Sequence, residues 1–321
     1  MPTSKHKKSL KYQLRLKGLR SPSGTIPLTS LKDICDLLLE AAERGLRLAV
    51  EGASVKRGRL PAWLTNSLEL TVTGLKKGST VLNIEAPVLG ETAKDQIRQQ
   101  DLWYVAPEPQ DTALTLFSKS VHDTTAEAID SDAYDGGVLD SLLRFKPFLK
   151  NSAEKIQLKC VSRRTERFVI GKPQLAKIER LKAKLPEPRA FVISGRFDVI
   201  EHQKKRFHLV LSNGESLLGT IDTEHLDVEQ MRQFWGKKVT IKGVVHFRPS
   251  RQPRLIEAQV IKPMEEGDEV FETLPQEPSQ IEFSNLVRET AAARQDWLKE
   301  VWGKWPGDES IDELLAALNS N

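Results

Sequence analysis

The chain has 321 residues, of which 39% are hydrophobic and 29% are charged, and this length and balance are typical of a globular protein with two or three domains. No apolar run approaches the eighteen or so residues that a membrane span needs. The basic N-terminus, MPTSKHKKSLK, is followed by no apolar stretch of the kind that a signal peptide carries. We therefore expect a cytoplasmic protein without membrane association.

The net charge of +4 hides an asymmetry along the chain. Residues 264–321 contain four basic and fourteen acidic side chains, a net charge of −10, so the rest of the chain carries +14. A basic body attracts polyanions such as nucleic acid, whereas an acidic tail attracts a basic partner or folds back onto the body.

Residues 1–110 are predicted to form an α+β domain. The segment TSLKDICDLLLEAAERG has apolar residues on one helical face and ends at Gly45, where we expect the helix to stop. Strands are expected where apolar and polar residues alternate, at 12–19, 46–52, 68–75 and 79–89.

Residues 111–186 are predicted to form a helical and hairpin segment with a basic surface. Helical periodicity covers 111–130, 136–149 and 173–185, and a strand hairpin with a basic tip is expected over 154–172.

Residues 187–263 are predicted to form a small β-barrel. Five short strand patterns follow one another, Asn213-Gly214 is a strong hairpin signal, and a helix over 223–236 precedes the fourth strand. This order is similar to that of an OB-fold or SH3-like module. Residues 264–283 are acidic, contain two prolines and follow directly after a third, Pro263, so we expect a linker there, followed by a helical partner-binding tail over 284–321.

The sequence contains no motif that favours an enzyme. Phosphate-cradling, dinucleotide-binding and nucleophile-elbow motifs are all missing from it. The acidic loop 130–137 begins like a calcium loop but has neither the glycine spacing nor the closing glutamate. We therefore predict a protein that is not an enzyme, with no catalytic residues, metal ligands or cofactor.

Basic clusters indicate nucleic acid as one predicted partner. Their alternative interpretation is a set of solvated faces, because the stacking aromatics that single-strand binding usually needs are sparse. The candidates for phosphate contact are Lys56, Arg57, Arg59, Arg163, Arg164 and Arg167.

The tail gathers three of the six tryptophans of the chain within nine residues, 297–305. Tryptophan is a preferred anchor at protein interfaces, and a helix behind a flexible linker cannot bury three of them against itself. The alternative is that the tail docks onto its own domains. The expected partner-binding residues are Trp297, Trp302, Lys304, Trp305, Pro306, Asp308, Glu309, Ile311, Leu314, Leu315 and Leu318.

The end of this tail, GKWPGDESIDELLAAL, resembles the C-terminal end of short bacterial antitoxins that neutralise PIN-domain ribonuclease toxins. The Trp-Pro-Gly-Asp-Glu turn at 305–309 and the leucines at 314, 315 and 318 match that pattern. The resemblance implies that the tail wraps a PIN-like nuclease toxin and blocks its acidic active site, with Lys304 as the basic side chain. It covers about a tenth of the chain, and the preceding body departs from the small DNA-binding head of that family. The alternative function is nucleic-acid binding by a basic body with an autoinhibitory acidic tail.

Overall fold

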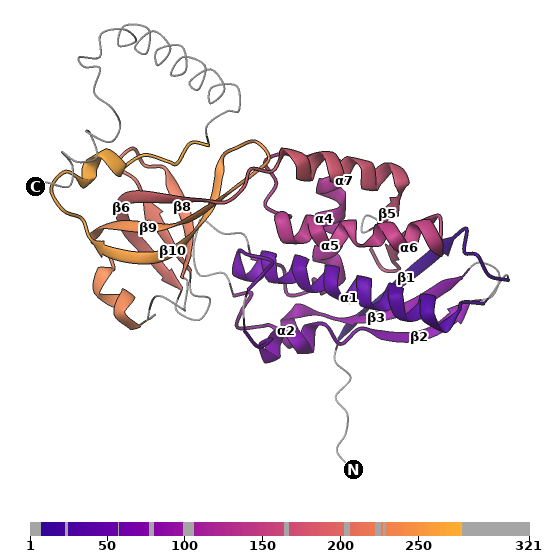
Figure 1. The fold of residues 1–321 in the computed structure, drawn as a ribbon. Helices are drawn as coiled ribbons and strands as arrows, with labels where there is room; N and C mark the ends of the chain where they lie inside the picture. Colours follow the sequence, from indigo (N-terminus) through magenta and orange to yellow (C-terminus); the bar gives the residue numbers. More distant parts are fainter. Residues whose placement is uncertain are drawn as a thin grey trace, which may run out of the picture. The chain divides into compact units, whose positions relative to one another are not determined.

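The structure, a computed structural model, describes residues 8–22, 25–56, 58–76, 80–98, 106–163, 167–201, 206–221, 226 and 229–277. They form a five-stranded sheet with helices and, further along the chain, a closed five-stranded barrel (Figure 1). The prediction of an α+β protein with a small β-barrel is confirmed to that extent. The predicted tail and the last residues of its acidic linker, 278–283, lie outside these residues.

The sheet is antiparallel throughout and has the order β2-β3-β1-β4-β5. Strand β1 (Ser9–Lys17) lies in its centre, between β3 (Val81–Pro87) and β4 (Lys155–Cys160), while β2 (Thr71–Lys76) and β5 (Arg167–Gly171) form the edges. The predicted boundary at residue 110 therefore divides strands of one sheet, because β1 pairs with partners on both sides of that boundary.

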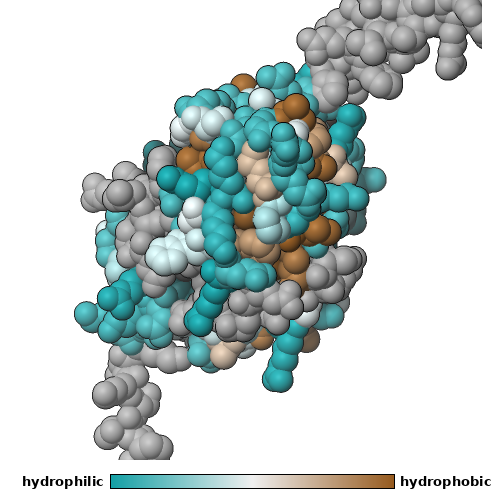
Figure 2. Space-filling view, turned by 90° about the vertical axis from the view of Figure 1, so that its left-hand side faces the viewer, coloured by the Kyte–Doolittle hydropathy of each residue, from teal (hydrophilic) through white to brown (hydrophobic). Residues whose placement is uncertain are grey.

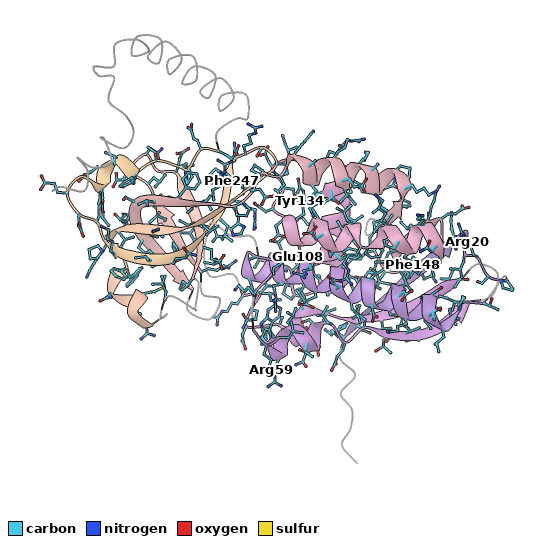
Figure 3. The ribbon with its side chains drawn as sticks, viewed as in Figure 1. Arg20, Arg59, Glu108, Tyr134, Phe148 and Phe247 are labelled. Carbon is cyan, nitrogen blue, oxygen red and sulfur yellow. The ribbon has the colours of Figure 1, made fainter. Side chains whose placement is uncertain are left out.

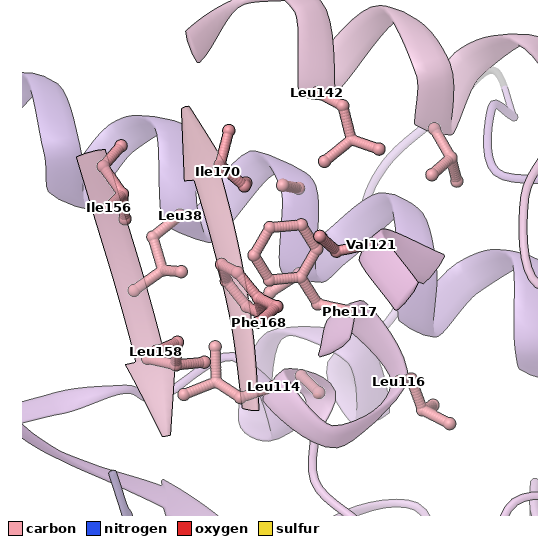
Figure 4. Packing of buried hydrophobic residues seen from close by; sticks show 14 of the residues in the cluster. Leu38, Leu114, Leu116, Phe117, Val121, Leu142, Ile156, Leu158, Phe168 and Ile170 are labelled. Atoms are coloured by element: carbon pink, nitrogen blue, oxygen red, sulfur yellow. The ribbon is translucent and has the colours of Figure 1, made fainter. Parts of the chain in front are cut away.

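Apolar side chains from one face of this sheet build the main core with the helices. Phe117 and Phe168 meet edge to face with ring centroids 4.9 Å apart, in a layer that also holds Leu38 and Leu158 (Figure 4). The helices are α1 (Leu28–Glu51), α2 (Ala62–Ser67), α3 (Leu89–Thr92), α4 (Ala113–Thr125), α5 (Gly136–Leu143), α6 (Phe145–Asn151) and α7 (Lys172–Lys184).

Helix α1 corrects one prediction from the sequence. The expected strand at 46–52 is wrong, because the helix continues through it to Glu51. Gly45 does not stop the helix, which continues past it beside α4, where a Cβ on Gly45 would lie 3.4 Å from the backbone of Phe117. The true stop is Gly52, whose φ of 80° is the left-handed conformation that ends helices and favours glycine.

The start of α4 is tied to the central strand. Thr112 and Thr115 form a reciprocal capping box, and the buried Tyr12 hydroxyl of β1 shares hydrogen bonds of 2.8 and 3.0 Å with their hydroxyls. The expected single helix at 136–149 is instead two helices, α5 and α6, which follow one another at Arg144.

The barrel closes in the order β10-β8-β7-β6-β9, and β10 pairs in parallel with β8 and antiparallel with β9. Its strands are β6 (Arg189–Glu201), β7 (Arg206–Val210), β8 (Ser216–Ile221), β9 (Lys238–Phe247) and β10 (Pro253–Pro263). The helix expected at 223–236 is, where it is described, the 3-10 helix η1 (Glu229–Phe234). A second 3-10 helix, η2 (Asp268–Phe271), lies in the predicted linker and is held by Asp268, which accepts a hydrogen bond from Thr240.

The sheet part and the barrel belong to one compact unit, Met1–Gln276, and arginines of the barrel join them. Arg254 is buried, donates to the carbonyl of Gly52 at 2.8 Å and lies 3.6 Å from a carboxylate oxygen of Asp135. Asp135 also caps α5 through the amide of Val138 and accepts both the amide and the hydroxyl of Ser54. One carboxylate therefore holds a helix start, a loop and the barrel.

No helix in the described part of the chain is long and apolar enough to cross a membrane.

Replacing Gly219 by alanine should destabilise the barrel. A Cβ at this position of β8 would lie 2.1 Å from the ring of Phe207, which stacks on Phe197 in the barrel core. Overpacking of this kind typically costs about 1–3 kcal/mol. Gly74→Ala, where the nearest atom would be 3.9 Å away, is the matched control and should change the free energy of unfolding little. Equal melting temperatures for the two variants would contradict this packing.

Asp135→Ala should destabilise the protein much more than Asp132→Ala. Asp135 and Arg254 are both largely buried, and removing one partner of a buried pair costs about 3–5 kcal/mol because the other charge stays behind. Asp132 also pairs with an arginine, Arg248, but its side chain is 71% exposed, so its loss should cost less than about 1 kcal/mol. Chemical denaturation of the two variants measures their free energies of unfolding. Similar decreases for both would show that Asp135 does not hold the barrel to the helices.

Candidate nucleic-acid interface

The second face of the five-stranded sheet presents polar side chains to solvent. Along β1 the side chains of Tyr12, Leu14 and Leu16 are buried in the core, so the alternate residues Lys11, Gln13, Arg15 and Lys17 belong to the other face, as period-two alternation requires. The same alternation places Lys155, Gln157 and Lys159 of β4 and Arg167 of β5 on that face.

Among the side chains that the structure describes, this surface, which we call the basic sheet face, contains six exposed cations. They are Lys11, Arg15, Lys17, Lys155, Lys159 and Arg167. The acid of these strands that shares the face is Glu85 of β3, and the nitrogen of Lys11 lies 3.6 Å from its carboxylate. Because five cations remain after this pair, the face has a strong positive potential.

Like charges lie directly opposite one another on this face. The strand register pairs Lys17 with Lys155 and Lys159 with Arg167. Directly opposed like charges destabilise a sheet, because the side chains of such pairs lie about 5 Å apart. A bound polyanion would turn this repulsion into attraction, whereas a face with only a structural role would gain stability from alternating charges.

The chemistry of the basic sheet face suits phosphates better than bases. Strands β1, β4 and β5 bring lysine, arginine, glutamine and one valine, Val169, to it, whereas their aromatic residues, Tyr12 and Phe168, point into the core. Lysine and arginine neutralise phosphates, whereas base recognition on a sheet needs stacking rings. Gln13 and Asn83 are joined by a long hydrogen bond of 3.4 Å in the middle of the face.

The structure brings one predicted nucleic-acid candidate, Arg167, onto this face. Arg163 instead pairs with Asp111 at 3.1 Å and donates to the carbonyl of Gln110 at 3.0 Å, which anchors the β4–β5 connection to the start of α4.

The candidates Lys56 and Arg59 are not part of the basic sheet face. The nitrogen of Lys56 lies 3.4 Å from Glu51 at the end of α1. Arg59 is exposed but lies just ahead of α2, far from Arg20, which follows β1 (Figure 3). Arg57 and Arg164 lie outside the described residues.

The five other cations of the basic sheet face were not named individually as candidates for phosphate contact, although Lys11, Arg15 and Lys17 lie in the basic stretch 5–20, which the sequence also indicated as a patch for nucleic acid. The strand expected at 12–19 contained the signal for their common face, because alternate residues of one strand share a face. What joins Lys155 and Lys159 to them is the pairing of β1 with β4, and strands 140 residues apart give no local sign of that pairing.

The barrel has a surface that its own chain occupies. Arg248 pairs with Asp132 at 2.6 Å, and Arg254 donates to Gly52. Leu218 and the buried Arg206 lie beside the same glycine, since a Cβ on Gly52 would be 3.4 and 3.7 Å from them. The start of β7, the middle of β8 and the β9–β10 connection are therefore in contact with the end of α1 and the loop before α5.

The predicted partner-binding residues of the tail, from Trp297 to Leu318, lie outside the residues that the structure describes. Where side chains are described, no three histidine, cysteine, aspartate or glutamate residues converge as metal ligands would.

Comparison with known proteins gives no relative: no protein-family model, no curated protein and no solved structure matches this chain significantly.

Proposed function

We propose that this protein binds nucleic acid through the backbone phosphates, on the basic sheet face. The observation that carries the proposal is the pair of like-charge contacts, Lys17 opposite Lys155 and Lys159 opposite Arg167, on an exposed sheet. These contacts cost stability in the free protein and become favourable when phosphates lie between them.

The composition of the face indicates which part of the ligand it recognises. Phosphate contacts fix the position of a protein on nucleic acid without conveying sequence, whereas base contacts specify sequence. With cations and amides but no exposed ring on the central strands, the basic sheet face binds with little sequence preference. Its affinity should fall steeply as salt rises, because binding releases counterions from the phosphates.

The arrangement of the barrel supports the same choice of surface. Its strand order, with β8 parallel to β10, favours an OB-like barrel over an SH3-like one. OB-folds bind oligonucleotides with their second and third strands and the connections between strands one and two and between strands four and five. Here residues of β7, β8 and the β9–β10 connection contact the end of α1 and the acids near α5. Contacts within the chain occupy these barrel residues, whereas the basic sheet face stays exposed.

Reversing two charges on the sheet should weaken binding without unfolding the protein. In the double variant Lys155→Glu/Lys159→Glu, each new carboxylate faces a cation, Lys17 or Arg167, so the melting temperature should stay the same or rise. Affinity for labelled single- and double-stranded nucleic acid, measured by anisotropy over a salt series, should fall at least about tenfold. The slope of log affinity against log salt should fall by about 2, near one for each lost phosphate contact.

The matched control is Lys119→Glu/Lys150→Glu, which makes the same change in net charge on exposed positions of α4 and α6. This control should alter the affinity for nucleic acid much less than Lys155→Glu/Lys159→Glu. Both double variants weaken the long-range electrostatic attraction equally, but only Lys155→Glu/Lys159→Glu removes direct phosphate contacts. Equal losses in the two variants would show that the charge of the whole protein, and not this face, attracts the ligand.

We infer a second candidate function for the tail, which rests on the sequence of residues 303–318. The Trp-Pro-Gly-Asp-Glu turn and the leucines that follow it resemble the toxin-binding end of antitoxins against PIN-domain nucleases. In this proposal the tail inhibits a PIN-like nuclease, with Trp305 as its main anchor. The nucleic-acid alternative gives the acidic tail another role, in which it competes for the basic body.

Two variants of the full chain separate these roles of the tail. Trp305→Ala should weaken inhibition of the PIN-like nuclease that the tail binds, to be sought among neighbouring genes, by about 30- to 1000-fold, the typical effect of losing a central interface tryptophan. The sequence offers Asp308 or Ser310 as the N-cap of a last short helix over Ile311 to Leu318, so Ser310→Ala should have an effect of only about tenfold or less. If Trp305→Ala inhibits like the wild type, while removal of 278–321 tightens nucleic-acid binding, the tail is autoinhibitory instead.

A further inference from the structure

The barrel carries an exposed tryptophan, Trp235, in the corner between η1 and β9. Its side chain is 69% exposed, whereas Trp63, the other tryptophan that the structure describes, is half-buried. The barrel end of the molecule shows hydrophobic areas among hydrophilic side chains (Figure 2). A large ring left in solvent on a folded surface is a candidate contact for a partner.

The corner that holds Trp235 is rigid. The indole nitrogen donates to the carbonyl of Asp198 at 2.6 Å, the amide of Gly236 donates to Phe197 at 2.7 Å, and the amide of Lys237 donates to Phe234 at 2.9 Å. Gly236 has a φ of 72°, which allows this reversal without strain. Because the ring is already fixed, a ligand that uses it would lose little conformational entropy in ordering it.

The hydrogen bond to Asp198 also limits what the ring can offer. A tryptophan that anchors a protein interface normally gives its N–H to the partner, but this N–H is already used within the chain. What remains exposed is the flat π surface of the ring, and flat aromatic rings such as nucleobases stack on such a surface.

The charges around Trp235 favour an anionic ligand. Arg196, Arg232, Lys237 and Lys238 are exposed on the same strand ends and turn. Two acids are close among the side chains that the structure describes: Asp198, 3.9 Å from Arg196, and Glu272, 2.8 Å from Lys238. The described surroundings of the ring are therefore net positive, which repels a basic protein segment and attracts phosphates.

We propose that Trp235 is a base-stacking platform for single-stranded nucleic acid, flanked by cations that contact the adjacent phosphates. This inference deepens the proposed function, on which its ligand class rests, by adding a base contact that the sheet lacks. Every base has a π face, so the platform would distinguish single strands from duplexes rather than one sequence from another. In a duplex the bases are stacked on each other and cannot reach the ring.

The test measures the binding of full-length variants to two ligands, a labelled oligothymidine of about 20 nucleotides and a duplex of the same length. This length exceeds the roughly 4–16 nucleotides that one small barrel contacts. Trp235→Ala should weaken binding of the single strand by about 5- to 100-fold, the usual effect of losing one stacking ring. Duplex affinity and the salt slope should not change. Trp235→Phe, which keeps an aromatic ring, should lose less affinity for the single strand than Trp235→Ala. Val270→Ala, at an apolar position of η2 that is 72% exposed, should leave the affinity unchanged.

Intrinsic fluorescence gives a second readout. The oligothymidine should quench the wild-type protein, and the part of that quenching due to Trp235 should be missing in Trp235→Phe. Melting temperatures of all four proteins should agree, because the ring is mostly exposed.

Single-strand binding by Trp235→Ala as tight as that of the wild type would overturn the platform. An equal loss on the duplex would also overturn it, because stacking cannot explain that result. The two proposals fail separately: if Lys155→Glu/Lys159→Glu leaves binding intact while Trp235→Ala weakens single-strand binding, the basic sheet face is wrong and the platform stands.

Discussion

The carboxylate of Asp135 is the contact on which the body of this protein depends most. It accepts the amide of Val138 at the start of α5, the amide and hydroxyl of Ser54 after α1, and lies 3.6 Å from the guanidinium of Arg254. Burial lowers the pKa of Arg254, while the nearby charges of Asp135 and Asp132 raise it and so favour the charged form. Without these acids the barrel would place an uncompensated cation in a buried joint, which is among the costliest defects in a folded protein. One helix start, a loop and a barrel strand therefore share one electrostatic partner.

This joint has a consequence for function, because it determines which basic surface stays exposed. The arginines of the β9–β10 connection and the start of β10 are engaged with Asp132, Asp135 and the carbonyl of Gly52. The cations of the basic sheet face, by contrast, project into solvent, and two pairs of them oppose each other across strands. Arginines whose charges are satisfied within the fold serve stability. Cations that repel one another at the surface need an external anion to become favourable.

The sheet face and Trp235 would also make different kinds of contact. The face offers charge and amides without rings, whereas the barrel corner offers one fixed ring with cations beside it. Phosphate contacts supply affinity and stacking supplies the preference for unpaired bases, so a protein with both would bind single strands more tightly than duplexes.

Particular residues show where local sequence patterns predict the structure correctly and where they do not. The alternation in residues 12–19 correctly predicted β1, and strand signals with the Asn213-Gly214 turn correctly predicted the five barrel strands. The segment LRLAVEG has the same alternation, yet it is the end of α1, because Leu46, Leu48 and Val50 are all buried on a helix that packs within the core. Gly45 was the expected helix stop and Gly52 is the observed one, and their surroundings, α4 beside the first and a left-handed turn at the second, distinguish them. Arg163 and Arg167 are neighbours in one basic cluster, but Arg163 is paired with Asp111 and Arg167 is exposed.

The sequence by itself determined the classes of structure: an α+β part, a five-stranded barrel, a basic body and an acidic end. These follow from periodicity, turn residues and charge counts, which are local or additive properties of a chain. Only the tertiary structure decided which basic residues form one surface, because the pairing of β1 with β4 joins residues about 140 positions apart. It alone decided that the arginines around β10 belong to a joint and that Trp235 keeps its ring in solvent. Burial and partnership depend on what the fold brings beside a side chain, and a linear pattern does not contain that information.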